Sequence, residues 1–168
     1  MGSANNDAMQ KMMQEWMRCA TPGPQHKLLE KMAGKWTTRT KQWMDPSAPP
    51  SESSGSSEGK MTFGGRFLVA NIIGQCMGQK TETMTVMGYD VFKGKYESIA
   101  FGSMGTAVYA AAGDMDADGK TLTFRGEMDD AMGKRPVRYV IRIESEDRHV
   151  LEVYDSMMGR EVQVVETT

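Results

Sequence analysis

The chain has 168 residues, with 20 basic and 22 acidic side chains, a formal net charge of -2 and two cysteines. This length suits one domain with its own hydrophobic core. The balanced charge argues against partners such as nucleic acid or an anionic membrane, and the polar start Met1–Met9 does not resemble a signal peptide. No apolar run could span a bilayer, so we expect a cytoplasmic protein in which Cys19 and Cys76 are reduced.

One or two short helices are expected before the first strand. Residues 7–19 carry a row of apolar side chains at helical spacing: Met9, Met12, Met13, Trp16 and Met17. We interpret this row as a face that docks a partner or forms a homodimer. Thr21-Pro-Gly-Pro24 ends the helix, and a second helix runs to about Gly34, a usual C-terminal glycine. We therefore divide the chain into a helical extension, 1–23, and a main domain, 24–168.

From Trp36 onward the apolar pattern alternates, as in strands. Lys35–Trp43 is expected to be the first strand, and the segment 45–57, rich in proline and serine, is expected to be a loop that could act as a lid. Nine more strands are predicted: Glu58–Phe63, Arg66–Ile73, Thr81–Tyr89, Tyr96–Phe101, Thr106–Ala112, Thr121–Glu127, Val137–Glu144, His149–Asp155 and Glu161–Glu166. Short strands without intervening helices predict an all-β fold, an antiparallel up-and-down barrel of about ten strands.

Several turn motifs look like ligand sites but are better explained as turns. Asp114-x-Asp116-x-Asp118-Gly119 imitates a calcium loop, yet its twelfth position is Arg125 instead of glutamate, so an acidic hairpin is expected. The basic stretch 134–138 is expected to be a solvated turn. Five of the 17 methionines precede glycine, and three of these pairs lie in expected turns, where glycine supplies a positive φ and methionine covers the barrel end. Because the pairs are scattered, no copper or other metal site is predicted.

Motifs along nearly the whole chain resemble domain-of-unknown-function family 1579, known from bacteria. They are Pro24-x-His26-Lys-Leu-Leu, Gly34-x-Trp36, Trp43-Met-Asp-Pro46, Gly64-Gly-Arg-Phe-Leu68, Gly88-Tyr-Asp90, Ser103-Met-Gly105 and Val153-Tyr-Asp155. The resemblance implies a calycin-like barrel, related to lipocalins and fatty-acid-binding proteins, in which the second helix and Trp36 close one end. It implies no activity.

A barrel of this kind suggests a binding site for a small apolar or amphipathic molecule. Arg66, beside two glycines, could hold a carboxylate, although stacking on Trp36 at the barrel bottom is the alternative. The candidate ligand-binding residues are Arg66, Met87, Tyr89, Met104, Tyr109, Tyr139, His149 and Tyr154. Asp90 and Asp155, each after a tyrosine at a strand end, are expected to fix turns.

Three alternatives stay open. The interior could instead host a metal-free enzyme, such as an isomerase or cyclase, although no catalytic residue is assigned. The resemblance also brings in haem, because related ten-stranded barrels bind it through one histidine, for which His149 is the candidate. Finally, the chain could be an interaction protein with a filled interior. The sequence does not identify a cofactor.

Overall fold

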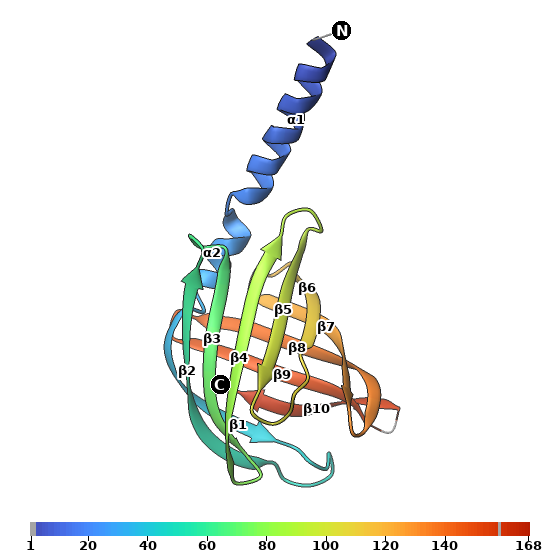
Figure 1. Ribbon diagram of the computed structural model, residues 1–168. Coiled ribbons are helices and arrows are strands. Elements are labelled where there is room, and N and C mark those ends of the chain that lie inside the picture. The colour runs from blue at the N-terminus through green and yellow to red at the C-terminus, as the bar shows by residue number, and fades with distance from the viewer. Residues whose placement is uncertain (1–2, 158) are drawn as a thin grey trace.

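The computed structural model describes residues 3–157 and 159–168, in which ten antiparallel strands form a closed barrel preceded by two helices (Figure 1). Each strand pairs with the next along the chain, and β1 pairs with β10 to close the barrel. The expected up-and-down barrel is therefore confirmed. The elements are α1 Ser3–Ala20, α2 Pro24–Glu30, β1 Gly34–Gln42, β2 Ser51–Thr62, β3 Phe67–Cys76, β4 Gln79–Asp90, β5 Lys95–Gly102, β6 Tyr109–Met115, β7 Thr121–Asp130, β8 Gly133–Ser145, β9 Arg148–Met157 and β10 Arg160–Thr167.

The two helices have different relations to the barrel. α1 projects away from it, whereas α2 packs against β2, β3 and β4 (Figure 1). Proline at the first turn and Gly23 as N-cap begin α2, and the Gly23 N–H donates to Nδ1 of His26 at 3.0 Å. No helix in the described ranges is long and apolar enough to cross a membrane.

The serine-rich segment is not a loop, contrary to our expectation. Residues 51–57 form the first half of β2, which pairs with β1 in continuous register from Gly34↔Gly59 to Gln42↔Ser51. Only residues 43–50 connect the two strands. Neighbouring backbone comes very close here, because a Cβ at Gly55 would lie 2.2 Å from the carbonyl oxygen of Ile73. The close approach of the neighbouring backbone requires small residues in this half of β2. The packing that they allow outweighs their low intrinsic preference for strands.

The hydrophobic core lies between α2 and one end of the barrel. Its most buried side chains are Leu29 of α2, Leu68, Leu122 and Phe124, each less than 2% exposed. Burying one such side chain contributes roughly 1.5–3 kcal/mol. The helix is thus held to the barrel chiefly by apolar packing.

The acidic turn and the predicted methionine–glycine turns are confirmed. Gly119 has φ of 68°, and Asp118 accepts the backbone N–H groups of Lys120 and Thr121, as in an ordinary acidic turn. Gly78, Gly133 and Gly159, each preceded by methionine in the sequence, also have positive φ. Left-handed backbone is costly for other residues, so glycine suits these positions in or next to tight turns.

Candidate functional site

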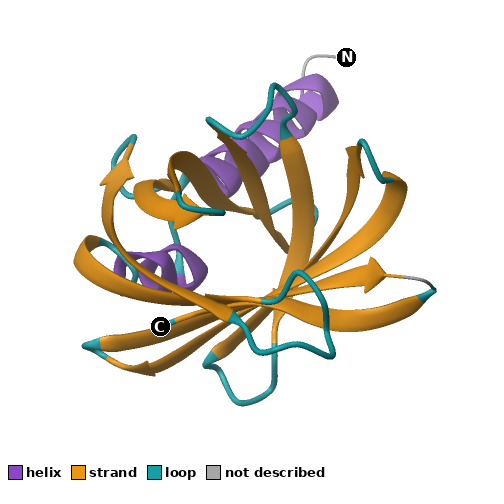
Figure 2. Ribbon diagram, turned by 90° about the horizontal axis from the view of Figure 1, so that it is seen from below, coloured by secondary structure: helices purple, strands orange, loops and turns teal. Residues whose placement is uncertain are grey.

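The barrel has a closed end and an open end. At the closed end α2 lies within the outline of the strands (Figure 2). Trp36, near the start of β1, donates from Nε1 to the carbonyl oxygen of Met32 at 3.2 Å and so fixes the connection that follows α2. The opposite, open end is bordered by the β1–β2, β3–β4, β5–β6, β7–β8 and β9–β10 connections. This is the end of the barrel that α2 does not cover.

Methionine marks the rim of the open end. Four of the five connections there carry a methionine that is 61–76% exposed: Met44, Met77, Met104 and Met132. Met158, in the fifth connection, lies outside the described residues. Methionine is flexible and polarizable, so it adapts to differently shaped apolar partners. The rim thus has an apolar and adaptable surface.

One wall of the interior is lined by small hydroxyl side chains. Along β1 and β2 every second residue is half-buried, and Trp36, which packs inside against His149, defines that alternate set as inward-facing. Across β1, β2, β4 and β5 this set includes Thr38, Thr40, Ser53, Ser57, Thr81, Thr83, Thr85 and Ser98. Between β2 and β4, strand β3 adds the apolar side chains of Leu68, Ala70 and Ile72 to the same wall. The hydroxyl side chains remain partly exposed although they point inward. Solvent therefore reaches this wall.

The opposite wall is apolar toward the closed end. Phe124 on β7 pairs with Tyr139 on β8, which pairs with Val153 on β9, so the three side chains share one face of the sheet. Ile141 and Leu151 form the next such pair toward the closed end. The interior consequently has two unlike sides, one rich in hydroxyls and one aromatic and aliphatic.

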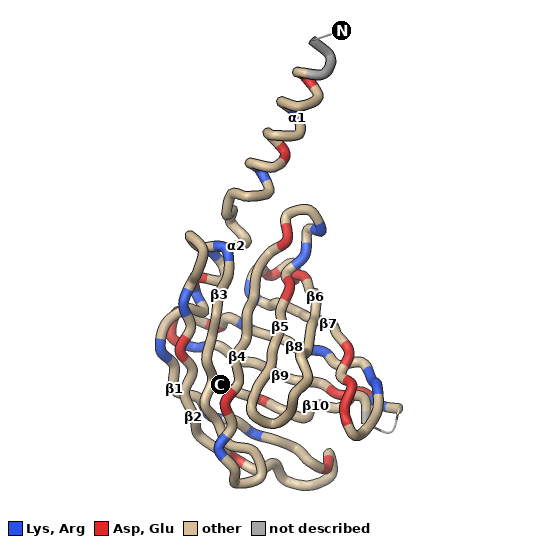
Figure 3. The backbone as a smooth tube through the Cα atoms, viewed as in Figure 1, with Lys and Arg blue, Asp and Glu red and all other residues tan. Residues whose placement is uncertain are grey.

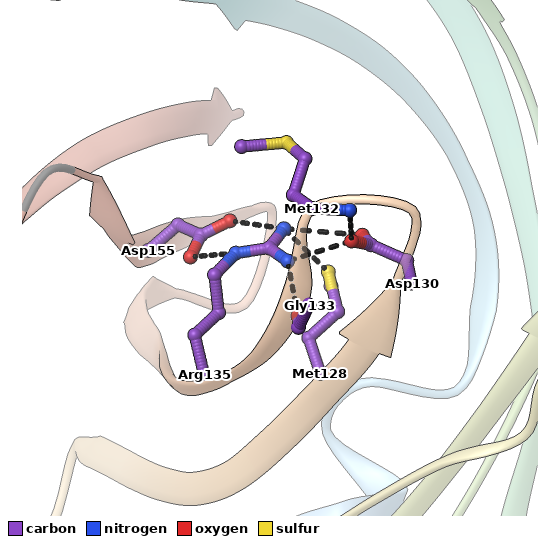
Figure 4. A network of polar contacts seen from close by, with 6 residues as sticks. All are labelled: Met128, Asp130, Met132, Gly133, Arg135 and Asp155. Atoms are coloured by element: carbon purple, nitrogen blue, oxygen red, sulfur yellow. Dashed lines mark hydrogen bonds and ion pairs between the residues drawn. The ribbon is translucent and has the colours of Figure 1, made fainter.

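Arg135 is the charged centre of the interior near the open end (Figure 4). Its Nε and Nη2 donate to the two Asp155 oxygens at 2.7 and 2.9 Å, in the planar two-bond geometry typical of arginine and carboxylate. Nη1 and Nη2 also donate to the two Asp130 oxygens at 2.7 and 3.1 Å. The side chains of Arg135 and Asp155 are each only 11% exposed, whereas that of Asp130 is 32% exposed. The network is therefore partly buried, with Asp130 on its wet side.

Two expectations about these residues are wrong. The basic stretch 134–138 is not a solvated turn but the start of β8, and Asp155 forms a buried ion pair instead of fixing a turn. The sequence does contain a signal for the position of Arg135, namely the alternation of inward and outward residues along a strand. Arg135 lies two positions before Val137, in phase with the apolar residues of β8, and therefore faces inward.

The network has no free donor but has excess negative charge. Nη1 donates its second hydrogen to the Gly133 carbonyl oxygen at 3.1 Å, so all five guanidinium N–H groups have acceptors. Hydrogen bonds to Asp130 and Asp155 raise the pKa of the Arg135 guanidinium above its usual value. The Arg135 hydrogen bonds, and the Met132 N–H, lower the pKa of Asp130. One cation thus faces two carboxylates, and the group carries a charge of about one negative unit.

Tyr139 lies close enough to this network to respond to it. Burial raises the pKa of the Tyr139 phenol, and Tyr109 and Asp155 raise it further by charge repulsion. The phenol therefore stays protonated at neutral pH and offers one O–H donor and one acceptor. Of the residues predicted for the site, Tyr109 and Tyr139 are brought close to one another, and Tyr139 lies near Asp155.

His149 lies at the closed end and packs against Trp36, with ring centroids 4.4 Å apart. Burial lowers the pKa of its imidazole. Its Nε2 has almost no exposed surface and no hydrogen-bond partner in the described part of the chain. An axial haem ligand needs its nitrogen directed at open space. Nε2 of His149 is buried instead, and its imidazole packs against Trp36 as a side chain that helps to close the barrel.

The other predicted site residues are dispersed. Arg66 lies in the β2–β3 turn at the closed end, where it donates to the carbonyl oxygens of Phe63, at 2.8 Å, and Ala20. Tyr89 lies at the closed end beside Tyr96, at 4.9 Å between ring centroids, and Met87 joins the same core cluster.

Two further predicted residues lie away from the interior. Tyr154 is on the outer face, with Arg138 stacked 3.9 Å from its ring centroid, and Met104 lies at the open rim. Asp90 fixes a turn as expected, accepting the Phe92 N–H at 2.8 Å.

Two hollows are formed by the described residues. A cavity of about 410 Å³ lies between α2 and the closed-end strands and is lined by Leu28, Tyr89, Tyr96 and Met115, among others. A second, of about 750 Å³, is lined mainly by charged and polar residues of β1, β2 and β10. Among the described residues, no group of three or more His, Cys, Asp or Glu side chains could hold a metal ion.

Comparison with known proteins gives a family and no activity. The family model described as "Protein of unknown function (DUF1579)" matches residues 21–168. No curated protein matches the chain.

Proposed function

The chain belongs to the DUF1579 family of proteins of unknown function, and we propose that it binds a small amphipathic molecule inside its barrel. The observation that carries the proposal is the pairing of a hydroxyl-lined wall with an apolar wall in one partly solvated interior. Ligand pockets are usually apolar with a few polar groups that fix orientation. An interior with two unlike sides suits a molecule that is itself two-sided.

The network at the open end suggests the charge of the ligand. Arg135 has no free donor for a ligand carboxylate, and the surplus carboxylate favours a neutral or cationic head group. Tyr139 and the Asp155 oxygens provide the acceptors for such a group. Arg66, whose guanidinium binds two backbone carbonyls at the closed end, would then have a structural role instead of the ligand-binding role expected from the sequence.

Catalysis has less support than binding. Both oxygens of Asp155 already accept hydrogen bonds from Arg135, and the raised pKa of Tyr139 makes its phenol a poor base at neutral pH. A general acid or base needs a group that exchanges protons near the working pH. We therefore propose a binding protein instead of the cavity-based enzyme.

The experiment compares two alanine-to-phenylalanine variants. Ala100 on β5 faces inward, paired with Thr85, whereas Ala110 on β6 is exposed on the outer face. A solvatochromic dye that enters the barrel would be displaced by dodecylamine and, much less, by dodecanoate. Ala100→Phe should weaken binding at least tenfold, and Ala110→Phe should leave it unchanged. Equal binding by both variants, or no dye binding by the unaltered protein, would contradict the proposal.

A further inference from the structure

α1 has an apolar face that its own barrel leaves uncovered. The five apolar side chains predicted from the sequence are all 58–73% exposed: Met9, Met12, Met13, Trp16 and Met17. The helix projects from the barrel (Figure 1), to which Arg66 ties it through the Ala20 carbonyl oxygen. A face of this kind on a water-exposed helix normally packs against another element.

The charges of α1 lie on its opposite side. At 100° per residue, Asp7, Lys11, Glu15 and Arg18 fall on the face away from the methionines. Figure 3 marks acidic and basic residues along α1. Two acids balance two bases, and Arg18 binds Glu15 at 2.9 Å within the helix. Helices that bind anionic lipid surfaces have an excess of lysine and arginine on the polar face. A neutral polar face with an uninterrupted apolar face instead favours pairing with another helix.

We propose that α1 pairs with α1 of a second copy of this chain, in antiparallel orientation, about a two-fold axis between Met12 and Met13. Met12 then faces the partner's Met13, and Met9 faces the partner's Trp16. The same face thus meets itself, as a two-fold interface requires. Methionine suits such contacts because its flexible side chain can adjust to the irregular surface of the facing methionines.

The exposed apolar area is sufficient for a dimer. The exposed fractions of the five side chains correspond to on the order of 600 Å² on each helix. Covering both faces completely would bury at most about 1,200 Å² in total, the lower limit for a specific interface. We therefore expect a reversible dimer that forms at moderate protein concentration.

The antiparallel orientation follows from where the barrels attach. An 18-residue helix is about 27 Å long, and paired helices lie about 8–10 Å apart. A parallel pair would bring both barrels to the same end of the helices, whereas an antiparallel pair places them at opposite ends. Opposed helix dipoles also favour the antiparallel pair.

This inference is independent of the proposed ligand. The family match begins at residue 21, so α1 precedes the part of the chain that the family model covers. Dimerisation through α1 would be a property added to the barrel, and it could fail without affecting binding inside it.

The first test is sedimentation of the full chain over a range of concentrations. The unaltered protein should dimerise, and Trp16→Glu should weaken the dimer more than about 100-fold, because it places an unpaired charge in the interface. Lys11→Glu, on the opposite face of the same helix, is the matched control and should remain dimeric. An unaltered protein that stays monomeric throughout, or a Trp16→Glu variant that still dimerises, would overturn the proposal.

The second test fixes the orientation by disulfide formation under oxidation. In the proposed pair the two Cys19 residues are about 20 Å apart and should not cross-link, whereas Met13→Cys with Cys19→Ser should cross-link readily. Cross-linking through Cys19 would instead indicate a parallel pair and contradict the proposed one. Binding of a monomer to zwitterionic vesicles would assign the apolar face to lipid and refute the dimer.

Discussion

Replacing Arg135 should destabilise the barrel far more than replacing the neighbouring lysine. Arg135→Met leaves Asp155, whose side chain is 11% exposed, without its cation. Removing one partner of a buried ion pair costs about 3–5 kcal/mol. The 32% exposure of Asp130 shows that water reaches part of the network, which lowers the expected loss to about 3 kcal/mol.

The same reasoning orders the other variants. Asp155→Asn should cost about 2 kcal/mol, because the guanidinium keeps Asp130 as a partner, and Asp130→Asn should cost less than about 1 kcal/mol. Lys134→Met is the matched control: its ion pair with Glu127 has both side chains more than 60% exposed, so it should be nearly neutral. Arg135→Met combined with Asp155→Leu should recover most of the loss, since no buried charge then remains unpaired.

Urea denaturation followed by tryptophan fluorescence measures these free energies of unfolding. A double-mutant cycle between Arg135 and Asp155 should give a coupling above about 1.5 kcal/mol. If the losses in free energy of unfolding of the two single variants simply add in the double variant, Arg135 and Asp155 do not depend on each other. An Arg135→Met variant as stable as Lys134→Met would likewise refute a buried ion pair.

Three further outcomes follow from the described contacts. Burial lowers the pKa of His149, so at low pH the unfolded state binds a proton more readily than the folded state does. The free energy of unfolding should therefore fall as pH drops below 6.5, and it should fall less in His149→Phe. A pH profile that this variant leaves unchanged would contradict the burial of a neutral His149. Gly113→Ala should cost about 1–3 kcal/mol in denaturation, because its Cβ would lie 2.3 Å from the Thr123 carbonyl oxygen, while Gly105→Ala has open space and should be tolerated. Trp36→Phe loses the bond to Met32 and should cost about 1 kcal/mol, measured by thermal unfolding. No change in melting temperature would speak against a stabilising role for this bond between β1 and the connection after α2.

The sequence predicted the fold well because alternation and turn chemistry are local signals. Gly78, Gly119 and Gly133 mark hairpins through backbone requirements that hold in any context. The serine-rich part of β2 was misassigned for the opposite reason. Its strand conformation depends on close packing by β1 and β3, which a local pattern does not contain.

The site was less predictable because it depends on which strands face one another. Asp155 and Arg135 are separated by 20 residues, and their contact follows from the β8–β9 register. Strand phase alone was enough to place Arg135 inside, yet its charged neighbours suggested a surface turn. Arg66 looked like an anchor from its flanking glycines, but those glycines form the turn that carries it to the closed end.

The most direct test of the binding proposal uses the methionines as reporters. In protein labelled with ¹³C at the methionine methyl groups, dodecylamine would be added below its micelle concentration. We predict saturable shifts for Met128, which contacts Arg135 at the network, and for Met104 at the rim, with the α1 methionines unaffected. A spectrum that does not change, or changes confined to Met9, Met12, Met13 and Met17, would contradict a ligand site inside the barrel.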